Sequence, residues 1–207
     1  PVNGTALRVI SCHLGGSSSI TGIRNGVSIG TSMGMSPQSG LPQNNRVGDL
    51  DAEAIPYAVK SLGITIEEAQ RQLTKESGLK GISGVSNDIR DVHNAANSGN
   101  ASAKLALETY VASARHWIGS YFFELGSADA IVFTAGIGEN DVAIRSGICA
   151  GLEGLGIELD SALNASTRAI EAVISKLGSR VKLMVIPTNE ELVVARETKR
   201  LLENSRN

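Results

Sequence analysis

The sequence has few aromatic residues, little net charge and no long apolar run, and each shortage argues against a class of protein. Aromatic residues make up 3% of the 207 residues, with a single tryptophan, so little surface is available for stacking bases. The net charge of −2 gives no electrostatic support for binding nucleic acid or an anionic membrane. No apolar run reaches the roughly 18 residues of a membrane helix. We therefore expect neither a nucleic-acid partner nor a membrane partner.

Cysteine is also scarce. Cys12 and Cys149 lie far apart in apolar surroundings, which predicts two buried thiols in a reducing compartment and hence a cytoplasmic protein. A catalytic thiol or a disulfide is the alternative. No signal peptide is visible, and the chain begins with Pro1 shortly before a strand-like run, which suggests a processed chain or a piece of a longer one.

The residues that are present have an ordinary globular composition, with 42% apolar and 19% charged residues. The first part of the chain predicts a β-meander, with strands at residues 7–13, 18–23 and 27–32. The pair Asn25-Gly26 is a strong hairpin signal between the last two strands. Residues 36–49 have no periodicity, and a loop of this length in a compact domain is usually functional or disordered.

Helices and strands alternate in the rest of the chain, which predicts an α/β fold. Thr65 and Glu68 have the spacing of a capping box, and Asp88 is a plausible helix cap after a loop at residues 81–88. The predicted helices span residues 51–62, 65–75, 101–125, 142–149, 161–177 and 189–203, and the predicted strands span 129–134 and 181–186.

The stretch "SCHLGGSSS", residues 11–19, is the first candidate site. Two glycines after a strand allow strained backbone angles and bring N–H groups close to an anion. The serine hydroxyls add donors, and His13 can donate to a phosphate or an acyl oxygen. A Gly-Ser hairpin turn beside a packed histidine is the alternative.

A second candidate is the segment "AGIGEN", residues 135–140, between a strand and a helix. A glycine turn at this position offers free N–H groups and the positive helix end to a phosphate. The segment lacks the third glycine of a dinucleotide fingerprint and the Gly-Lys-Ser/Thr of a P-loop. A tight strand-to-helix turn is the alternative.

Near the end of the chain, Glu190 and Glu191 fall in the first turn of the helix predicted after the last strand. Acidic residues there complement the helix dipole. The functional alternative is a carboxylate that holds Mg²⁺ directly or through water.

Three further residues allow both a functional and a structural interpretation. Arg46, in the long loop, can stabilise phosphoryl charge or can simply be solvated. Asp88 and Arg90 can bind a base or ribose, or can be a cap and a surface ion pair. His93 and His116 have neither cysteine nor acid partners at metal-ligand spacing, and we interpret both as structural.

The order of these blocks carries more information than any one of them. "HLGG", "TSMGMSP", "SNDIRDV", "FTAGIGEN" and "PTNEELVVAR" follow one another along nearly the whole chain. In this order they resemble the acetate kinase family of acyl-phosphate-forming kinases.

The resemblance implies a ribonuclease-H-like α/β fold of the actin/Hsp70/sugar-kinase superfamily, with a mixed sheet flanked by helices. Residues 1–207 would be the C-terminal nucleotide-binding domain, with the N-terminal domain absent from the chain. The family transfers the γ-phosphoryl group of ATP reversibly to acetate, giving acetyl phosphate and ADP, with Mg²⁺, and acts as a homodimer.

The resemblance also assigns residues to roles. His13 and Arg46 would be catalytic, and Glu190 would hold the metal. The residues that would bind the nucleotide are Gly15, Gly16, Ser17, Asp88, Ile89, Arg90, Gly136, Ile137, Gly138 and Asn140.

Two departures from the family pattern face the phosphoryl side. The usual His-Leu-Gly-Asn-Gly-Ala-Ser is His-Leu-Gly-Gly-Ser-Ser-Ser here, so Gly16 replaces an asparagine that contacts phosphate. The usual Gly-Thr-Arg-Ser-Gly-Asp is Asn-Asn-Arg-Val-Gly-Asp from Asn44 to Asp49. These changes leave three alternatives to acetate kinase activity: propionate or butyrate as acceptor, nucleotide binding without turnover, and a dimerisation module built on the long apolar helix.

Overall fold

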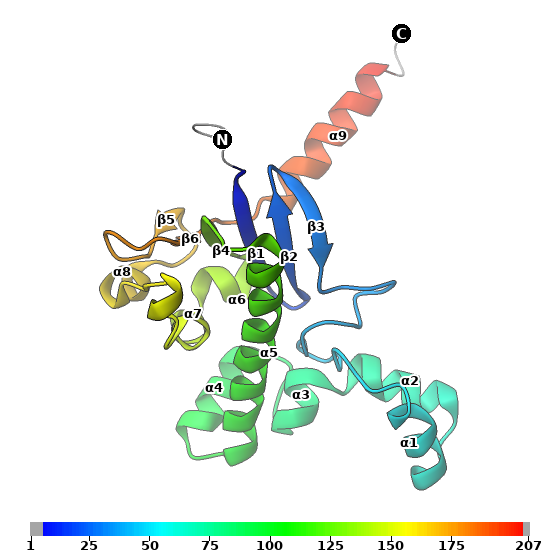
Figure 1. Ribbon diagram of the computed structural model, residues 1–207. Helices are drawn as coiled ribbons and strands as arrows, with labels where there is room; N and C mark the ends of the chain where they lie inside the picture. Colours follow the sequence, from blue (N-terminus) through cyan, green and yellow to red (C-terminus); the bar gives the residue numbers. More distant parts are fainter. Residues whose placement is uncertain (1–5, 205–207) are drawn as a thin grey trace.

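The computed structural model describes residues 6–204, and this part contains a six-stranded mixed sheet with helices around it (Figure 1). The order is β3-β2-β1-β4-β6-β5; β1, β4 and β6 are parallel, and the other pairs are antiparallel. The strands are β1 Arg8–Leu14, β2 Ser18–Arg24, β3 Val27–Thr31, β4 Ala130–Thr134, β5 Ala172–Val173 and β6 Lys182–Val185. The predicted mixed α/β architecture is confirmed.

The predicted meander is also confirmed. Asn25 and Gly26 have positive φ angles of 54° and 81°, as a two-residue hairpin turn between β2 and β3 requires. Alternate residues of β1 separate the two faces of the sheet: Ile10 and Cys12 are fully buried, whereas Val9 is only partly buried.

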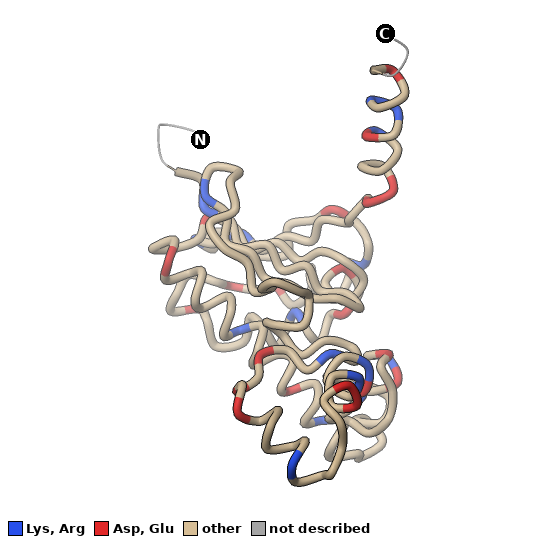
Figure 2. Tube along the Cα trace, turned by 90° about the vertical axis from the view of Figure 1, so that its right-hand side faces the viewer, with Lys and Arg blue, Asp and Glu red and all other residues tan. Residues whose placement is uncertain are grey.

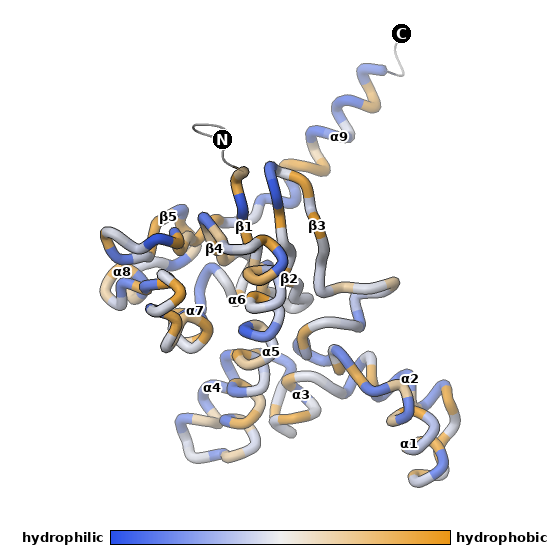
Figure 3. The backbone as a smooth tube through the Cα atoms, viewed as in Figure 1, coloured by the Kyte–Doolittle hydropathy of each residue, from blue (hydrophilic) through white to orange (hydrophobic). Residues whose placement is uncertain are grey.

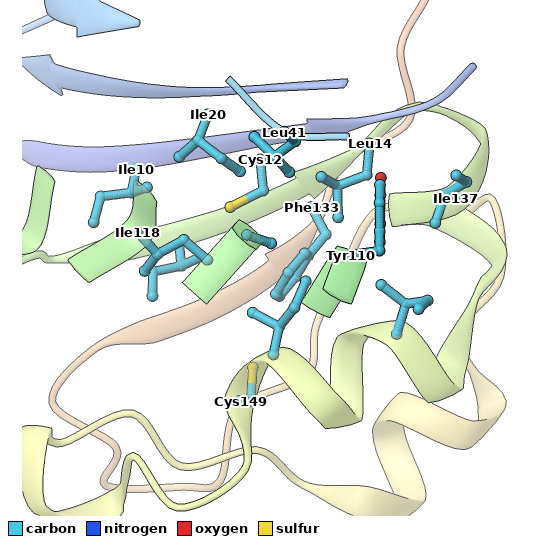
Figure 4. Packing of buried hydrophobic residues seen from close by; sticks show 14 of the residues in the cluster. Ile10, Cys12, Leu14, Ile20, Leu41, Tyr110, Ile118, Phe133, Ile137 and Cys149 are labelled. Carbon is cyan, nitrogen blue, oxygen red and sulfur yellow. The ribbon is translucent and has the colours of Figure 1, made fainter. Parts of the chain in front are cut away.

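The helix α5 (Ala101–Leu125) covers the buried face of the sheet and has the bounds that the sequence predicts. Asn100 caps its first turn, and Gly126, with φ of 76°, ends it. Figure 4 shows Tyr110 and Ile118 of this helix packed among Cys12, Leu14 and Phe133 of the strands. A single core therefore supports both β1 and β4, the strands that lead into the candidate loops.

The remaining helices surround this core or extend from it (Figure 1). The predicted helix cap at Thr65 is confirmed, because Thr65 Oγ1 accepts a hydrogen bond from Glu68 N at 3.2 Å. The Glu68 carboxylate accepts from Arg71 and Gln72 instead of completing a capping box. The helices are α1 Ala54–Leu62, α2 Ile66–Lys75, α3 Gly78–Ser83, α4 Ile89–Asn97, α6 Ala135–Asn140, α7 Val142–Cys149, α8 Ser161–Ser166 and α9 Glu190–Asn204, with a short 3-10 helix at Glu153–Leu155.

Two predictions of secondary structure were wrong. The helix expected at residues 161–177 ends at Ser166, and the chain then forms β5 at the edge of the sheet. Ala169 has a φ of 49°, and Ile174 is fully buried with its N–H bonded to Leu183 O at 2.8 Å. Residues 172–173 therefore pair with β6 as a strand and do not continue the helix. The loop expected from residue 81 begins inside α3.

Charge and hydropathy are distributed as in an ordinary globular surface, with one exception. Basic and acidic residues are interspersed along the chain (Figure 2). Helix α9 has no buried residue, yet apolar positions recur along it (Figure 3). No described helix combines the length and apolar character needed to cross a bilayer.

Both cysteines are free and buried, as predicted. Burial raises the pKa of the Cys149 thiol to about 12 and also raises that of Cys12, so both are protonated near neutral pH.

Candidate functional site

The two glycine segments meet because their strands are neighbours. His13, near the end of β1, pairs with Thr134 at the end of β4 in the parallel ladder. A Cβ added to Gly15 would lie 3.3 Å from Ala135 Cβ, tighter than an ordinary contact. The carboxyl ends of parallel strands are the usual place for a ligand site in an α/β fold.

Two clefts open at this edge of the sheet. The large cleft, of about 900 Å³, lies between the glycine loop after β1, α4 and the α6–α7 segment. The small cleft, of about 590 Å³, lies between the same loop and the start of α9. Gly15, Gly16 and Gly136 line both clefts, so the two clefts are adjacent and share a glycine-lined border, which we call the neck.

Buried hydrogen bonds anchor the glycine loop after β1, residues 15–17. Ser18 Oγ donates to Gly15 O at 3.0 Å and lies 2.8 Å from Tyr110 Oη. Because the serine proton is used on Gly15, Tyr110 is the donor to Ser18. This chain of hydrogen bonds ties the loop to α5, and all of it is buried.

The segment "AGIGEN" forms the short helix α6 itself, which corrects the expectation of an open glycine turn before a helix. Gly136 has open space where a Cβ would stand, and it faces the clefts. Gly138 lines neither cleft: a Cβ there would lie 3.3 Å from the Phe133 carbonyl carbon, so this glycine serves packing against β4. Ile137 and Asn140 line the large cleft.

The small cleft brings together His13, Ser17 and the acidic start of α9. His13 Nε2 lies 4.0 Å from Glu190 Oε1. The turn before α9 is fixed by Glu139, a buried residue that the sequence did not single out. Its carboxylate accepts hydrogen bonds from Thr188 N at 3.0 Å and Thr188 Oγ1 at 3.2 Å.

The carboxylates of Glu190 and Glu191 fit a magnesium ion that is also bound by phosphates. Magnesium prefers hard oxygen ligands and keeps several waters, so one or two carboxylates beside a phosphate suffice. Within residues 6–204 no group of three or more His, Cys, Asp or Glu side chains is arranged to hold a metal by itself. Glu190 therefore has the chemistry of a metal ligand only when a phosphate shares the ion.

Arg46 reaches the glycine loop from the long loop. Its Nη1 donates to Ser17 Oγ at 2.8 Å and to Gln43 Oε1 at 3.0 Å. The structure thus brings Arg46 to Ser17, which lines the small cleft, although Arg46 itself lines neither cleft.

The loop that carries Arg46 is held by the start of α3. The carbonyl oxygens of residues 43, 44 and 45 accept hydrogen bonds from Leu79 N, Lys80 N and Ser77 N at 2.8, 2.9 and 3.1 Å. Gly78 has a φ of 61°, and an added Cβ would lie 2.0 Å from Gln43 O. Only glycine allows this approach, so α3, which the sequence did not predict, positions the loop.

At the far wall of the large cleft, Asp88 caps α4 by accepting a hydrogen bond from Arg90 N at 2.9 Å. The Arg90 guanidinium also bonds the Asp88 carboxylate and, with the backbone bond, holds the pKa of Asp88 at about 2. Both residues line the cleft, as does Ile89 between them. The cap and ion-pair interpretation is confirmed, and the location in the cleft is compatible with the functional one.

His93 has an acid partner that sequence spacing did not reveal. Its Nε2 lies 2.8 Å from Asp141 Oδ2, 48 residues further along, and both side chains line the large cleft. Asp141 raises the pKa of His93. His116, in contrast, is exposed and lies edge-on to the ring of Trp117.

Several polar residues of the large cleft were not predicted as site residues. They are Asn44, Asn87, Asn94, Asn97, Asp141 and Arg168. Asn87 and Asn94 lie close in sequence to the predicted Asp88 and Arg90. This proximity is the sequence signal that could have identified them.

Comparisons with known proteins identify the family of this chain. The model described as the Acetokinase family matches residues 2–196. Acetate kinases of Pseudothermotoga lettingae and Methanosarcina thermophila are 45% and 46% identical to this chain over 197 and 196 residues, and each alignment covers 95% of the chain and 48% of the relative.

Solved structures of whole kinases resemble the fold closely. An acetate kinase from Porphyromonas gingivalis has a TM-score of 0.90 at 37% identity, covering 95% of this chain and 49% of that one. A propionate kinase from Francisella tularensis subsp. tularensis has a TM-score of 0.85 at 40% identity, covering 92% and 48%. The chain thus spans about half the length of the relatives it matches. On its sequence and its fold, it belongs to the acetokinase family.

Proposed function

We propose that this chain is the C-terminal nucleotide-binding domain of an acyl kinase. The whole enzyme transfers the γ-phosphoryl group of ATP reversibly to a short-chain carboxylate, with acetate as the first candidate. The observation that carries the proposal is the neck formed by Gly15, Gly16 and Gly136, the border that the large and small clefts share. A nucleoside fits the large cleft, and its phosphate tail passes the glycines toward Glu190.

In the forward direction a carboxylate oxygen attacks the γ-phosphorus in line. The new oxygen–phosphorus bond forms as the bond to the β-phosphate oxygen breaks, and ADP leaves with that electron pair. Catalysis of such a transfer is mostly positioning and charge stabilisation. Arg46 supplies positive charge, His13 supplies a donor, and the glycines allow backbone N–H groups to approach the phosphates. Magnesium, when bound with Glu190, neutralises phosphate charge.

Further parts of the proposal concern the whole protein. A second domain supplies the other wall of the cleft and the acyl-binding residues, and the enzyme assembles as a homodimer in the cytoplasm. The buried free thiols of Cys12 and Cys149 support a reducing compartment. Light scattering on the full-length gene product tests the dimer.

The departures at Gly16 and Asn44 favour a second candidate, a family member with propionate or butyrate as its acceptor or without turnover. A coupled assay of the full-length gene product with acetate, propionate and butyrate distinguishes this second candidate from the first proposal. Turnover fastest with acetate supports the first proposal. Measurable ATP binding without turnover on any of the three acids contradicts it and supports loss of activity.

For this chain alone we expect ADP binding but no acetyl phosphate, because the nucleotide contacts lie within it and the second wall of the cleft does not. Isothermal titration with Mg²⁺-ADP, beside an acetyl phosphate assay, measures both properties. Absence of ADP binding, or robust acetyl phosphate production by the chain alone, would each contradict the proposal.

The role of Arg46 is tested by Arg46→Ala in the full-length gene product. Loss of one charge-stabilising donor of this kind raises the barrier by about 3 kcal/mol, so we expect kcat to fall about 100-fold. Arg24→Ala is the matched control, because Arg24 lies on β2 and donates to Glu124 O away from both clefts. Wild-type turnover in the Arg46 variant removes the proposed role.

A further inference from the structure

The carboxamide of Asn44 is an unused polar group at the glycine-lined neck. Asn44 lines the large cleft together with Gly15 and Gly16. Its Oδ1 is buried without a hydrogen-bond partner among the described residues. No hydrogen bond of its Nδ2 occurs in that part of the chain either. The buried oxygen can be satisfied only by a donor such as a water molecule, whereas the free Nδ2 is the atom that can donate to an anion at the neck.

The backbone of Asn44 is held in place. Its carbonyl oxygen accepts the N–H of Lys80 at 2.9 Å, and the neighbouring carbonyls are fixed by the same end of α3. Arg46, two residues on, is tied to Ser17. The side chain of Asn44 is therefore presented to the glycine loop by a rigid support, as a binding group requires.

Gly16 is the residue that Asn44 faces. A Cβ added to Gly16 would have Asn44 Nδ2 as its nearest neighbour, at 3.5 Å. The backbone of Gly16 does not lie in the left-handed region, so its conformation does not demand glycine. Because Gly16 has no side chain, the carboxamide of Asn44 can occupy the space beside the neck.

We infer that Asn44 is a phosphate-contacting residue, whose Nδ2 donates to the phosphate tail of the nucleotide. A side chain on residue 16 would reach the same position. This chain has glycine at 16 and asparagine at 44. The carboxamide beside Gly16 is thus carried by the loop that faces it. The inference rests on the proposed nucleotide binding and adds a residue to that site.

The test is a double-mutant cycle on this chain, with Mg²⁺-ADP and adenosine titrated separately. A hydrogen bond to a charged group contributes enough that Asn44→Gly weakens ADP binding about 10- to 100-fold. Adenosine binding stays unchanged, because adenosine carries no phosphate. Gly16→Asn alone also weakens ADP binding, since two carboxamides compete for one space. The double variant Gly16→Asn/Asn44→Gly restores ADP affinity to within about threefold, a non-additivity that independent sites do not show.

Asn45→Gly is the matched control for added loop flexibility, because Asn45 lines neither cleft. Asn44→Asp keeps the shape, removes the donor and adds negative charge, so it weakens ADP binding at least as much as Asn44→Gly. Thermal melts show that each variant is folded. Two results overturn the inference but leave the proposed function standing. One is a ratio of ADP to adenosine affinity that Asn44→Gly does not change. The other is a double variant that binds ADP as weakly as Asn44→Gly does. Absence of ADP binding by the unaltered chain overturns the proposed function as well.

Discussion

At the scale of single residues, Arg145 shows how a site is supported from within. It is fully buried, and its guanidinium donates to Gly138 O, Asn164 Oδ1, Asn164 O and Thr167 O at 2.7 to 3.1 Å. All these acceptors are amide oxygens, and burial lowers the pKa of Arg145. The residue joins α6, which borders the clefts, to the end of α8. In the sequence it is one arginine in a short helix and gives no sign of this role.

We expect Arg145→Met to reduce the free energy of unfolding by about 3 kcal/mol, because it leaves several buried carbonyl oxygens without donors. Urea denaturation measures the change. Arg200→Met is the control, since Arg200 is exposed on α9 and pairs only with Glu197 among the described residues. Equal stability of the two variants contradicts the support assigned to Arg145.

At the scale of elements, the His93–Asp141 pair braces α4 against the start of α7 across the large cleft. Asp141 also caps α7 by accepting a hydrogen bond from Ile144 N at 3.0 Å. The pKa of His93 is raised and that of Asp141 is lowered. The bridge therefore contributes fully below the unfolded pKa of His93, 6.5, and its contribution is lost as the pH rises through the raised value. At the acid end it is lost as the pH falls through the lowered pKa of Asp141.

We expect His93→Gln to destabilise the chain by about 1 to 2 kcal/mol near pH 5.5, and by progressively less as the pH rises through the raised pKa of His93. Denaturation at a series of pH values from about 5.5 upward measures the difference. His116→Gln is the matched control, because His116 is exposed and far from an acid partner in the described structure. A destabilisation that does not change with pH contradicts an ionic brace.

Several elements were predictable because their signals are local. Helix α5 follows from its cap at Asn100, its stop at Gly126 and a run of good helix formers between them. The hairpin at Asn25-Gly26 follows from the positive φ angles that those residues tolerate. The segment after Ser166 was not predicted, because its conformation depends on antiparallel pairing with β6 and not on its own apolar periodicity.

At the scale of the whole molecule, α9 stands apart from the rest (Figure 1). Its apolar residues Leu192, Val193 and Val194 are between 41% and 65% exposed, and none of its residues is buried. Its first turn nevertheless borders the small cleft, and Thr188 just before it is tied to Glu139. The helix therefore contributes to the site at one end and little to the core.

We expect a chain that ends at residue 189 to unfold with a free energy within about 0.5 kcal/mol of the 207-residue chain, because no residue of α9 is buried. Its melting temperature then stays within about 2 °C. A chain that ends at residue 181 is the contrasting control: it loses the fully buried Leu183 and Val185 of β6 and should not fold. A loss above about 2 kcal/mol in the first truncation shows that α9 packs on the domain.

The sequence by itself determined the first three strands, the long helix α5 and the chemistry of the glycine blocks, because turns, caps and apolar periodicity act over a few residues. It also contained the identities of Gly16 and Asn44. Only the tertiary structure decided that these two face each other, that His93 meets Asp141 and that α3 holds the Arg46 loop. Such contacts join residues far apart in the chain, and the parallel pairing of β1 with β4 brings the glycine blocks that follow these strands to one edge of the sheet.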